Sequence, residues 1–70
     1  MTPPHLTPRE HEIVALIAKG KRNKEIASAL GLTEDTVKEY VTRIMRKLGA
    51  VNRTDVAVRE FHRSREEKEA

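Results

Sequence analysis

The sequence contains no cysteine and no long apolar run. Without cysteine the chain can form neither a disulfide nor a thiolate metal site, so zinc fingers are excluded. No apolar stretch approaches the roughly 20 residues that a membrane-spanning helix needs, and no hydrophobic leader follows the N-terminus. We therefore expect a cytoplasmic, soluble protein that makes no contact with a membrane.

The chain is also short and only mildly basic. Its 70 residues allow one small domain, and so short a chain buries little apolar surface, so its stability should be marginal. It carries 14 Lys and Arg against 11 Asp and Glu, a net charge of +3. This excess suits a polyanionic partner without proving one. Residues 64–70 hold more acid than base, so the remainder is more basic than the whole.

Two helical patterns joined by three residues organise the chain. Apolar residues recur at helical spacing in residues 23–30 and again in residues 34–48, so each predicted helix has one apolar side. Gly31 can end the first of these helices, and the hydroxyl of Thr33 can cap the second. The residues predicted to face inward are Ile26, Ala27, Leu30, Val37, Val41, Ile44 and Leu48. This spacing predicts a helix-turn-helix whose recognition helix is residues 34–48.

Clear start and stop signals predict a helix before this motif. Thr7 is a candidate N-cap, Pro8 stands at the first helical position, and Glu10 closes a capping box. Gly20 ends the helix. Its predicted inward stripe consists of Ile13, Leu16 and Ile17, with Ala18 beside them. Asn23 is then the predicted N-cap of the following helix.

A fourth helix is predicted after Gly49, beginning at Asn52 or at Thr54. Its apolar stripe is Val56, Ala57 and Phe61, of which we expect Val56 and Phe61 to pack inward. The sequence shows no strand pattern, so the predicted fold is all-α with four helices. We expect residues 1–5 to be a flexible lead-in or linker stump, residues 6–64 to form the domain, and residues 65–70 to be a charged tail that frays.

One face of residues 34–48 is polar. Turning each residue about 100° from the last places Asp35, Lys38, Glu39, Thr42, Arg43 and Arg46 opposite the apolar side. A charged helix face is most often only solvated. Here, however, the face belongs to the second helix of a helix-turn-helix and mixes cations with groups that can read base edges, so we interpret it as a surface for double-stranded DNA.

Several motifs together resemble one known family. They are LTPRE at 6–10, the Gly20 stop, NKEIA at 23–27, TVK at 36–38, KLG at 47–49 and NR at 52–53. With them, Leu6 to Val56 resembles the LuxR-type (GerE- or NarL-type) DNA-binding domain of bacterial transcription regulators. The resemblance implies that the third helix enters the major groove and the fourth mediates dimerisation on DNA. It also implies the effector domain of a longer protein that carries either a receiver, as in a two-component response regulator, or a small-molecule sensor; a free-standing small regulator is the alternative.

The resemblance implies that Lys38, Glu39 and Thr42 contact DNA bases. Groups that suit phosphate contacts instead are Lys24, Thr33, Thr36, Arg43, Arg46 and Lys47. Three of these predicted DNA contacts could instead have a purely structural role. Thr33 could be an N-cap, Lys47 a solvated residue that favours the negative helix end, and Glu39 an ion-pair partner of Arg43. We expect Arg9 to make a structural contact with a nearby carboxylate rather than to contact DNA. Tyr40 departs from the histidine that the family more often has, which leaves the role of that position open.

The resemblance also implies a homodimer on DNA that forms through the fourth helix, and we expect its surface to be Val58, Arg59 and His62. RNA polymerase is a further candidate partner. The alternative function is a small helical adaptor resembling a sigma-factor segment, with its basic face on an acidic partner.

The histidines His5, His11 and His62 are scattered, so no metal site is predicted. No catalytic constellation or phosphate loop is present, so we expect neither an enzyme nor a cofactor.

Overall fold

The computed structural model describes the backbone of residues 5–69 and the side chains of residues 5–65. Four helices follow one another along the chain: α1 (Pro8–Ala18), α2 (Asn23–Leu30), α3 (Glu34–Leu48) and α4 (Arg53–Glu69). No strand occurs within this part of the chain, which confirms the predicted all-α fold. The predicted lead-in lies outside the described residues except for His5, and so does the last residue of the predicted tail.

α1 begins as the sequence predicts. The Thr7 hydroxyl accepts from the Glu10 backbone N–H at 3.2 Å, and the Glu10 carboxylate accepts from the Thr7 N–H at 2.8 Å, so both halves of the capping box form. The helix ends with Lys21 N–H donating to the Leu16 carbonyl and Gly20 N–H to that of Ile17, the Schellman pattern.

The predicted cap of α2 was wrong by one residue. Asn23 is the first helical residue, and Arg22 occupies the cap position in an extended conformation. Arg22 has no side-chain acceptor, so only the reverse half of a capping box forms, in which Glu25 accepts from the Arg22 N–H at 2.8 Å. The Asn23 side-chain oxygen accepts instead from the guanidinium of Arg53, which comes from α4.

The turn between α2 and α3 confirms the helix-turn-helix. Gly31 has φ of 68°, a left-handed conformation that only glycine adopts without cost, and Leu32 N–H donates to the Ala27 carbonyl. Thr33 then caps α3, since its hydroxyl accepts from the Thr36 N–H at 3.1 Å. The predicted bounds of the recognition helix are those of α3.

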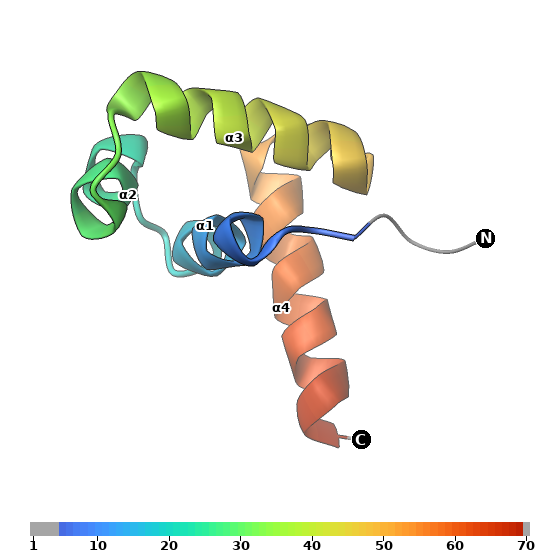
Figure 1. Cartoon of the computed structure of the whole chain (residues 1–70). Helices are drawn as coiled ribbons and strands as arrows, with labels where there is room; N and C mark the ends of the chain where they lie inside the picture. The colour runs from blue at the N-terminus through green and yellow to red at the C-terminus, as the bar shows by residue number, and fades with distance from the viewer. Residues whose placement is uncertain (1–4, 70) are drawn as a thin grey trace.

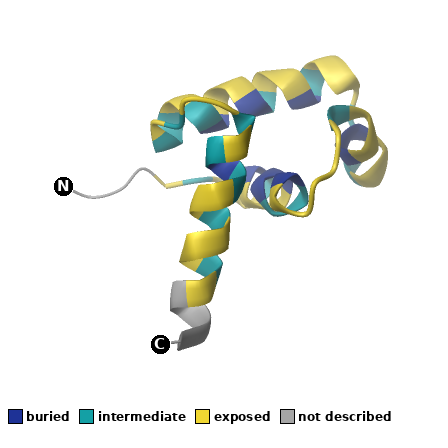
Figure 2. Cartoon of the chain, turned by 180° about the vertical axis from the view of Figure 1, so that it is seen from behind, coloured by how far each residue is buried: buried dark blue, intermediate teal, exposed yellow. Residues whose placement is uncertain are grey.

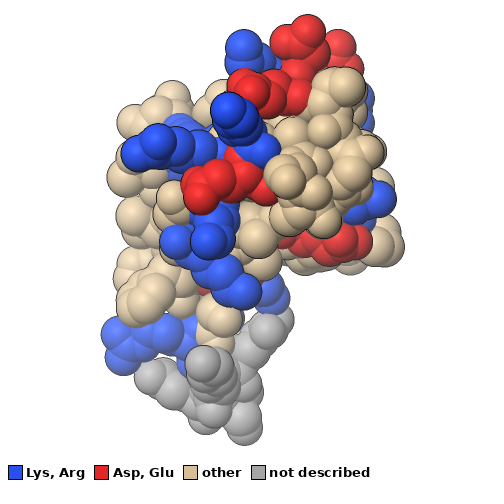
Figure 3. All heavy atoms as spheres, turned by 90° about the vertical axis from the view of Figure 1, so that its left-hand side faces the viewer, with Lys and Arg blue, Asp and Glu red and all other residues tan. Residues whose placement is uncertain are grey.

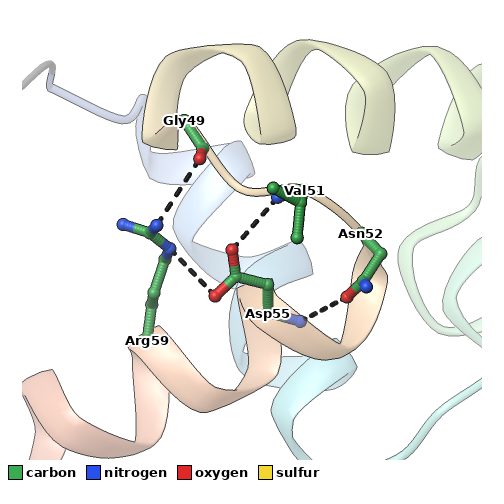
Figure 4. Close-up of polar contacts among 5 residues, drawn as sticks. All are labelled: Gly49, Val51, Asn52, Asp55 and Arg59. Carbon is green, nitrogen blue, oxygen red and sulfur yellow. Dashed lines mark hydrogen bonds and ion pairs between the residues drawn. The ribbon is translucent and has the colours of Figure 1, made fainter.

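A polar corner joins α3 to α4 (Figure 4). Asn52 caps α4, because its side-chain oxygen accepts from the Asp55 N–H at 2.8 Å, which decides between the two predicted starts. Asp55 in turn accepts from the Val51 N–H and from Arg59, whose guanidinium also donates to the Gly49 carbonyl. The corner therefore fixes the direction in which α4 leaves α3.

The helices cross at steep angles (Figure 1). α2 packs against α3, and α1 packs against both α4 and α3. α4 leaves the end of α3 and runs away from it past α1, so the later turns of α4 project beyond the other helices (Figure 1). The upper side of α3 in this view has no helix over it.

Buried residues line the inner sides of all four helices (Figure 2). The core consists of Ile13, Val14, Ile17, Ile26, Ala27, Val37, Val41, Ile44 and Val56. Leu16, Leu30 and Leu48 pack against it only in part, and Ala18 is exposed. The buried residue that the predicted stripe missed is Val14.

The prediction that Phe61 packs inward was wrong, since 56% of its surface is exposed. Val56 is fully buried, and Phe61 comes five residues later, about 140° further round the helix. At that point α4 has also begun to leave the core behind. Phe61 therefore lies on the flank of α4 beside α1, where it lines a shallow hollow with Ala15, Ala18 and Lys19.

Candidate nucleic-acid interface

The outer side of α3 carries the predicted reading surface. Val37, Val41 and Ile44 hold the other side of the helix in the core, which leaves its polar side in solvent. Five exposed side chains line one shallow hollow there: Lys38, Glu39, Thr42, Arg43 and Arg46. The structure thus brings all three predicted base-reading residues together with two predicted phosphate contacts. Whether each touches DNA stays a prediction.

Thr42 is bonded to its own helix. Its hydroxyl donates to the Lys38 carbonyl oxygen at 3.1 Å, so its hydrogen is occupied while the oxygen can still accept. In this rotamer Thr42 could offer a base edge its methyl group and an acceptor. Donation to a base would require the hydroxyl to rotate away from the carbonyl.

Arg43 contacts an aromatic ring rather than a carboxylate. Its guanidinium carbon lies 5.3 Å from the centre of the Tyr40 ring, within the range of a cation–π contact. Among the described residues no ion pair joins Arg43 to Glu39, although the spacing allowed one. The carboxylate of Glu39 therefore faces solvent without that partner.

The start of α3 carries two predicted phosphate contacts, Thr33 and Thr36. The Thr33 hydroxyl donates to the Thr36 hydroxyl at 2.9 Å as well as capping the helix. The capping alternative for Thr33 is thus confirmed. A phosphate contact by either residue stays a prediction.

A second basic hollow lies beside Lys38, where three helices begin. It is lined by Arg22, Asn23, Lys24, Glu34, Lys38 and Arg53. The Arg53 guanidinium crosses from α4 to donate to the Asn23 side chain and to the Lys21 carbonyl. The sequence predicted Lys24 and Lys38 as DNA contacts but neither Arg22 nor Arg53. The place of Arg53 has no local signal, since 30 residues separate it from its partner Asn23.

On one face of the molecule (Figure 3), cations and carboxylates alternate rather than forming a single basic patch. On the face seen in Figure 3, Lys and Arg side chains follow one another along the molecule, with Asp and Glu between them. A modest net charge spread in this way gives a weak general attraction for DNA. This distribution of charge does not by itself distinguish one DNA sequence from another.

Lys47, another predicted phosphate contact, lies against a buried acid. Its ammonium nitrogen is 2.8 Å from Oε1 of Glu10, which is only 1% exposed, whereas Lys47 is 31% exposed. Burial by itself raises the pKa of Glu10, but the hydrogen bonds from Lys47 and Thr7 outweigh it and hold the pKa below its ordinary value. The charge of Lys47 is therefore engaged inside the protein, and a phosphate contact by it stays a prediction.

The predicted dimer residues on α4 differ in their surroundings. Val58 is 47% exposed and His62 is exposed, with its ring edge-on to that of Phe61 at 6.0 Å. Arg59 instead turns to Asp55 at the α3–α4 corner. The Val51 N–H and then Arg59 hold the pKa of Asp55 below its ordinary value, against the opposing effect of burial. Val58 and Phe61 are thus the exposed large hydrophobic side chains on the described part of α4.

Other sequence predictions concern metals, membranes and Arg9. Within the described residues no three His, Cys, Asp or Glu side chains gather as metal ligands would. None of the described helices has the length and hydrophobicity to cross a membrane. Arg9 makes the predicted structural contact, an exposed ion pair with Glu12 at 3.5 Å.

Comparison with known proteins places this arrangement in a family. Residues 4–59 match the family described as bacterial regulatory proteins, luxR family. Over 57 residues, 79% of this chain and 27% of the relative, the chain is 53% identical to the transcriptional regulatory protein LiaR of Bacillus subtilis (strain 168). It is 50% identical over 56 residues to the response regulator protein VraR of Staphylococcus aureus (strain Mu3 / ATCC 700698), covering 80% of this chain and 27% of VraR.

A third relative is the DNA-binding transcriptional activator DevR/DosR of Mycobacterium tuberculosis (strain ATCC 25618 / H37Rv), 45% identical over 62 residues, which are 86% of this chain and 29% of that protein. The chain thus spans less than a third of the length of these relatives. The match covers all of α1, α2 and α3 and the first part of α4. The chain belongs to the luxR family of bacterial regulatory proteins, as a four-helix helix-turn-helix DNA-binding domain.

Proposed function

We propose that this domain recognises a specific double-stranded DNA sequence by placing the outer side of α3 in the major groove. The observation that carries the proposal is that a helix anchored in the core by one side presents Lys38, Glu39 and Thr42 together on the other. Lysine can donate to guanine, a carboxylate can accept from cytosine, and threonine can contact either polar edges or a thymine methyl group. These three residues would determine the sequence preference.

Phosphate contacts would orient α3 in the groove. The proposed residues are Lys24, Thr33, Thr36, Arg43, Arg46 and Lys47, to which the basic hollow adds Arg22. Such contacts fix the register of the protein on DNA and carry no sequence information of their own. Lys47 would have to leave or share its contact with Glu10, so it is the weakest member of the set.

We also propose that the domain pairs on DNA through the outer side of α4. Val58 and His62 of the predicted surface are exposed, and the exposed Phe61 enlarges it. A patch this small suits weak association in solution, which becomes effective when two adjacent half-sites hold two copies close together. Arg59, which Asp55 and Gly49 already engage, would lie at the edge of this surface.

For the longer protein, we propose a response regulator that acts on the bacterial chromosome and therefore in the cytoplasm. Support comes from relatives named as a response regulator protein and as a two-component response regulator. RNA polymerase would be a further partner of such a regulator. The alternative of a protein-binding adaptor would instead leave the face of α3 without a nucleic-acid role.

Selection of bound duplexes from a random pool tests the proposal. We expect a consensus of two related half-sites, with affinity falling steeply as salt rises, because each phosphate neutralised contributes about −0.9 to the slope of log K against log salt. A pool that shows no enrichment, together with duplex affinity that is insensitive to salt, would favour the adaptor.

A further inference from the structure

We propose that Tyr40 is a positioning residue for DNA binding, because its ring holds the Arg43 guanidinium ready to contact phosphate. This inference rests on the proposed function and assigns a role to a side chain that had none. The two residues are three apart on α3, so they are neighbours on its surface, and the guanidinium carbon lies 5.3 Å from the ring centre.

The ring is a firm support because the core holds it. Tyr40 is half-buried and packs against the hydrophobic cluster beneath α3, whereas Arg43 is exposed. A long arginine side chain on a helix otherwise samples many rotamers and must lose that freedom when it binds. Contact with an anchored ring restricts those rotamers before DNA arrives, so less freedom is lost on binding.

The kind of contact also matters. A carboxylate such as Glu39 would occupy the N–H donors of Arg43 and cancel its charge, whereas an aromatic ring attracts the cation without accepting those donors. No ion pair joins Glu39 to Arg43 in the described residues, so the donors of Arg43 are not used there. The planar group can therefore donate to a phosphate while it remains against the ring.

The position of Arg43 on α3 suits the phosphate backbone better than the base edges. Counting about 100° per residue, Arg43 lies within about 20° of Thr36, two turns earlier, and away from Lys38 on the other edge of the polar side. Thr36 and Thr33 stand at the N-terminus of the same helix. Arg43 and Thr36 would thus follow one DNA strand, while Lys38 and the basic hollow face the other.

The test is a double-mutant cycle on duplex binding, measured by fluorescence anisotropy with a duplex of mixed sequence at low salt. Tyr40→Leu removes the ring, Tyr40→Phe removes only the hydroxyl, and Arg43→Gln removes the cation. We expect Tyr40→Leu to weaken binding about two- to fivefold, because the Arg43 side chain must then lose more rotamer freedom when it binds, and Tyr40→Phe to leave binding unchanged. In the Arg43→Gln background, Tyr40→Leu should have no further effect.

Two further readings separate positioning from folding. Tyr40→Trp keeps an aromatic ring and should bind at least as well as the native protein, and circular dichroism reports whether Tyr40→Leu remains folded. Equal weakening by Tyr40→Leu with and without Arg43 would overturn the proposal, and so would equal losses for Tyr40→Phe and Tyr40→Leu. If the native domain shows no salt-dependent duplex binding at all, the proposed function itself fails, which is a different result.

Discussion

Replacing Glu10 by glutamine should destabilise the domain substantially without changing the shape of the side chain. Glu10 is almost fully buried and accepts two hydrogen bonds at 2.8 Å, from the Thr7 N–H and from the Lys47 ammonium. A hydrogen bond to an ionised group stabilises a protein by about 1 kcal/mol more than a neutral one, so losing the charge costs about 2 kcal/mol over the two bonds.

A loss of that size is large for this chain. Seventy residues at a typical stability of about 0.05–0.15 kcal/mol each give a free energy of unfolding of about 4–10 kcal/mol. The same loss lowers the melting temperature by about 8–16 °C in a domain of this length. Thermal and urea unfolding followed by circular dichroism would measure both quantities.

The effect of Glu10→Gln should also depend on pH. The folded state holds the pKa of Glu10 below its ordinary value, so the unfolded state takes up a proton first as pH falls. The stabilisation is therefore complete at neutral pH and disappears as pH falls through the folded-state pKa. The native and variant melting temperatures should converge in acid and differ at pH 7.

Two matched controls make the result specific. Glu12→Gln removes an exposed carboxylate from the same helix, one paired with Arg9 at 3.5 Å, and should change stability by less than about 0.5 kcal/mol. Lys47→Met should cost less in the Glu10→Gln background than in the native one, because no buried charge is then left unpaired. The reasoning is refuted if Glu10→Gln and Glu12→Gln have equal effects, or if the Glu10→Gln difference is the same at pH 7 and in acid.

The remaining predictions concern DNA binding and pairing. Lys38→Ala should weaken the binding free energy for the selected site by about 1–3 kcal/mol, measured by titration, whereas the control Lys19→Ala removes a surface charge away from α3. Equal affinities of the two variants would show that Lys38 reads no base. Glu39→Gln should raise affinity for random duplexes and flatten the preference at one base pair of each half-site, and a selection that returns the native consensus would show that Glu39 reads no base. Val58→Asp should abolish paired binding to adjacent half-sites while a single half-site is still bound, and sedimentation showing a tight dimer that survives this change would exclude that surface.

Local signals in the sequence determined the four helices. Thr7, Thr33 and Asn52 each cap a helix through groups no more than three residues away, so neighbouring residues alone carry the information. Hydrophobic periodicity likewise sufficed for α3, where Val37 and Val41 are both buried as predicted. These interactions lie within one helix and its cap, so residues close together in the sequence are enough to predict them.

Tertiary structure decided what lies between the helices. The sequence placed Glu10 in a capping box but could not show that Lys47, 37 residues later, reaches the same carboxylate. Arg53 likewise donates a hydrogen bond to the side chain of Asn23, which the sequence predicted to be a helix cap. Such pairs depend on the angles at which α1, α2, α3 and α4 cross, and no local spacing encodes those angles.

The same limit applies to the functional surface. The composition of the outer side of α3 could be predicted from periodicity, because every residue there lies on one helix. The partner of Arg43 could not, since Glu39 and Tyr40 both lie about one helical turn before it, and only the structure shows its guanidinium over the ring of Tyr40. Phe61 was misplaced for the opposite reason: its helix continues past the core, and periodicity gives the direction of a side chain without showing whether anything lies there to cover it.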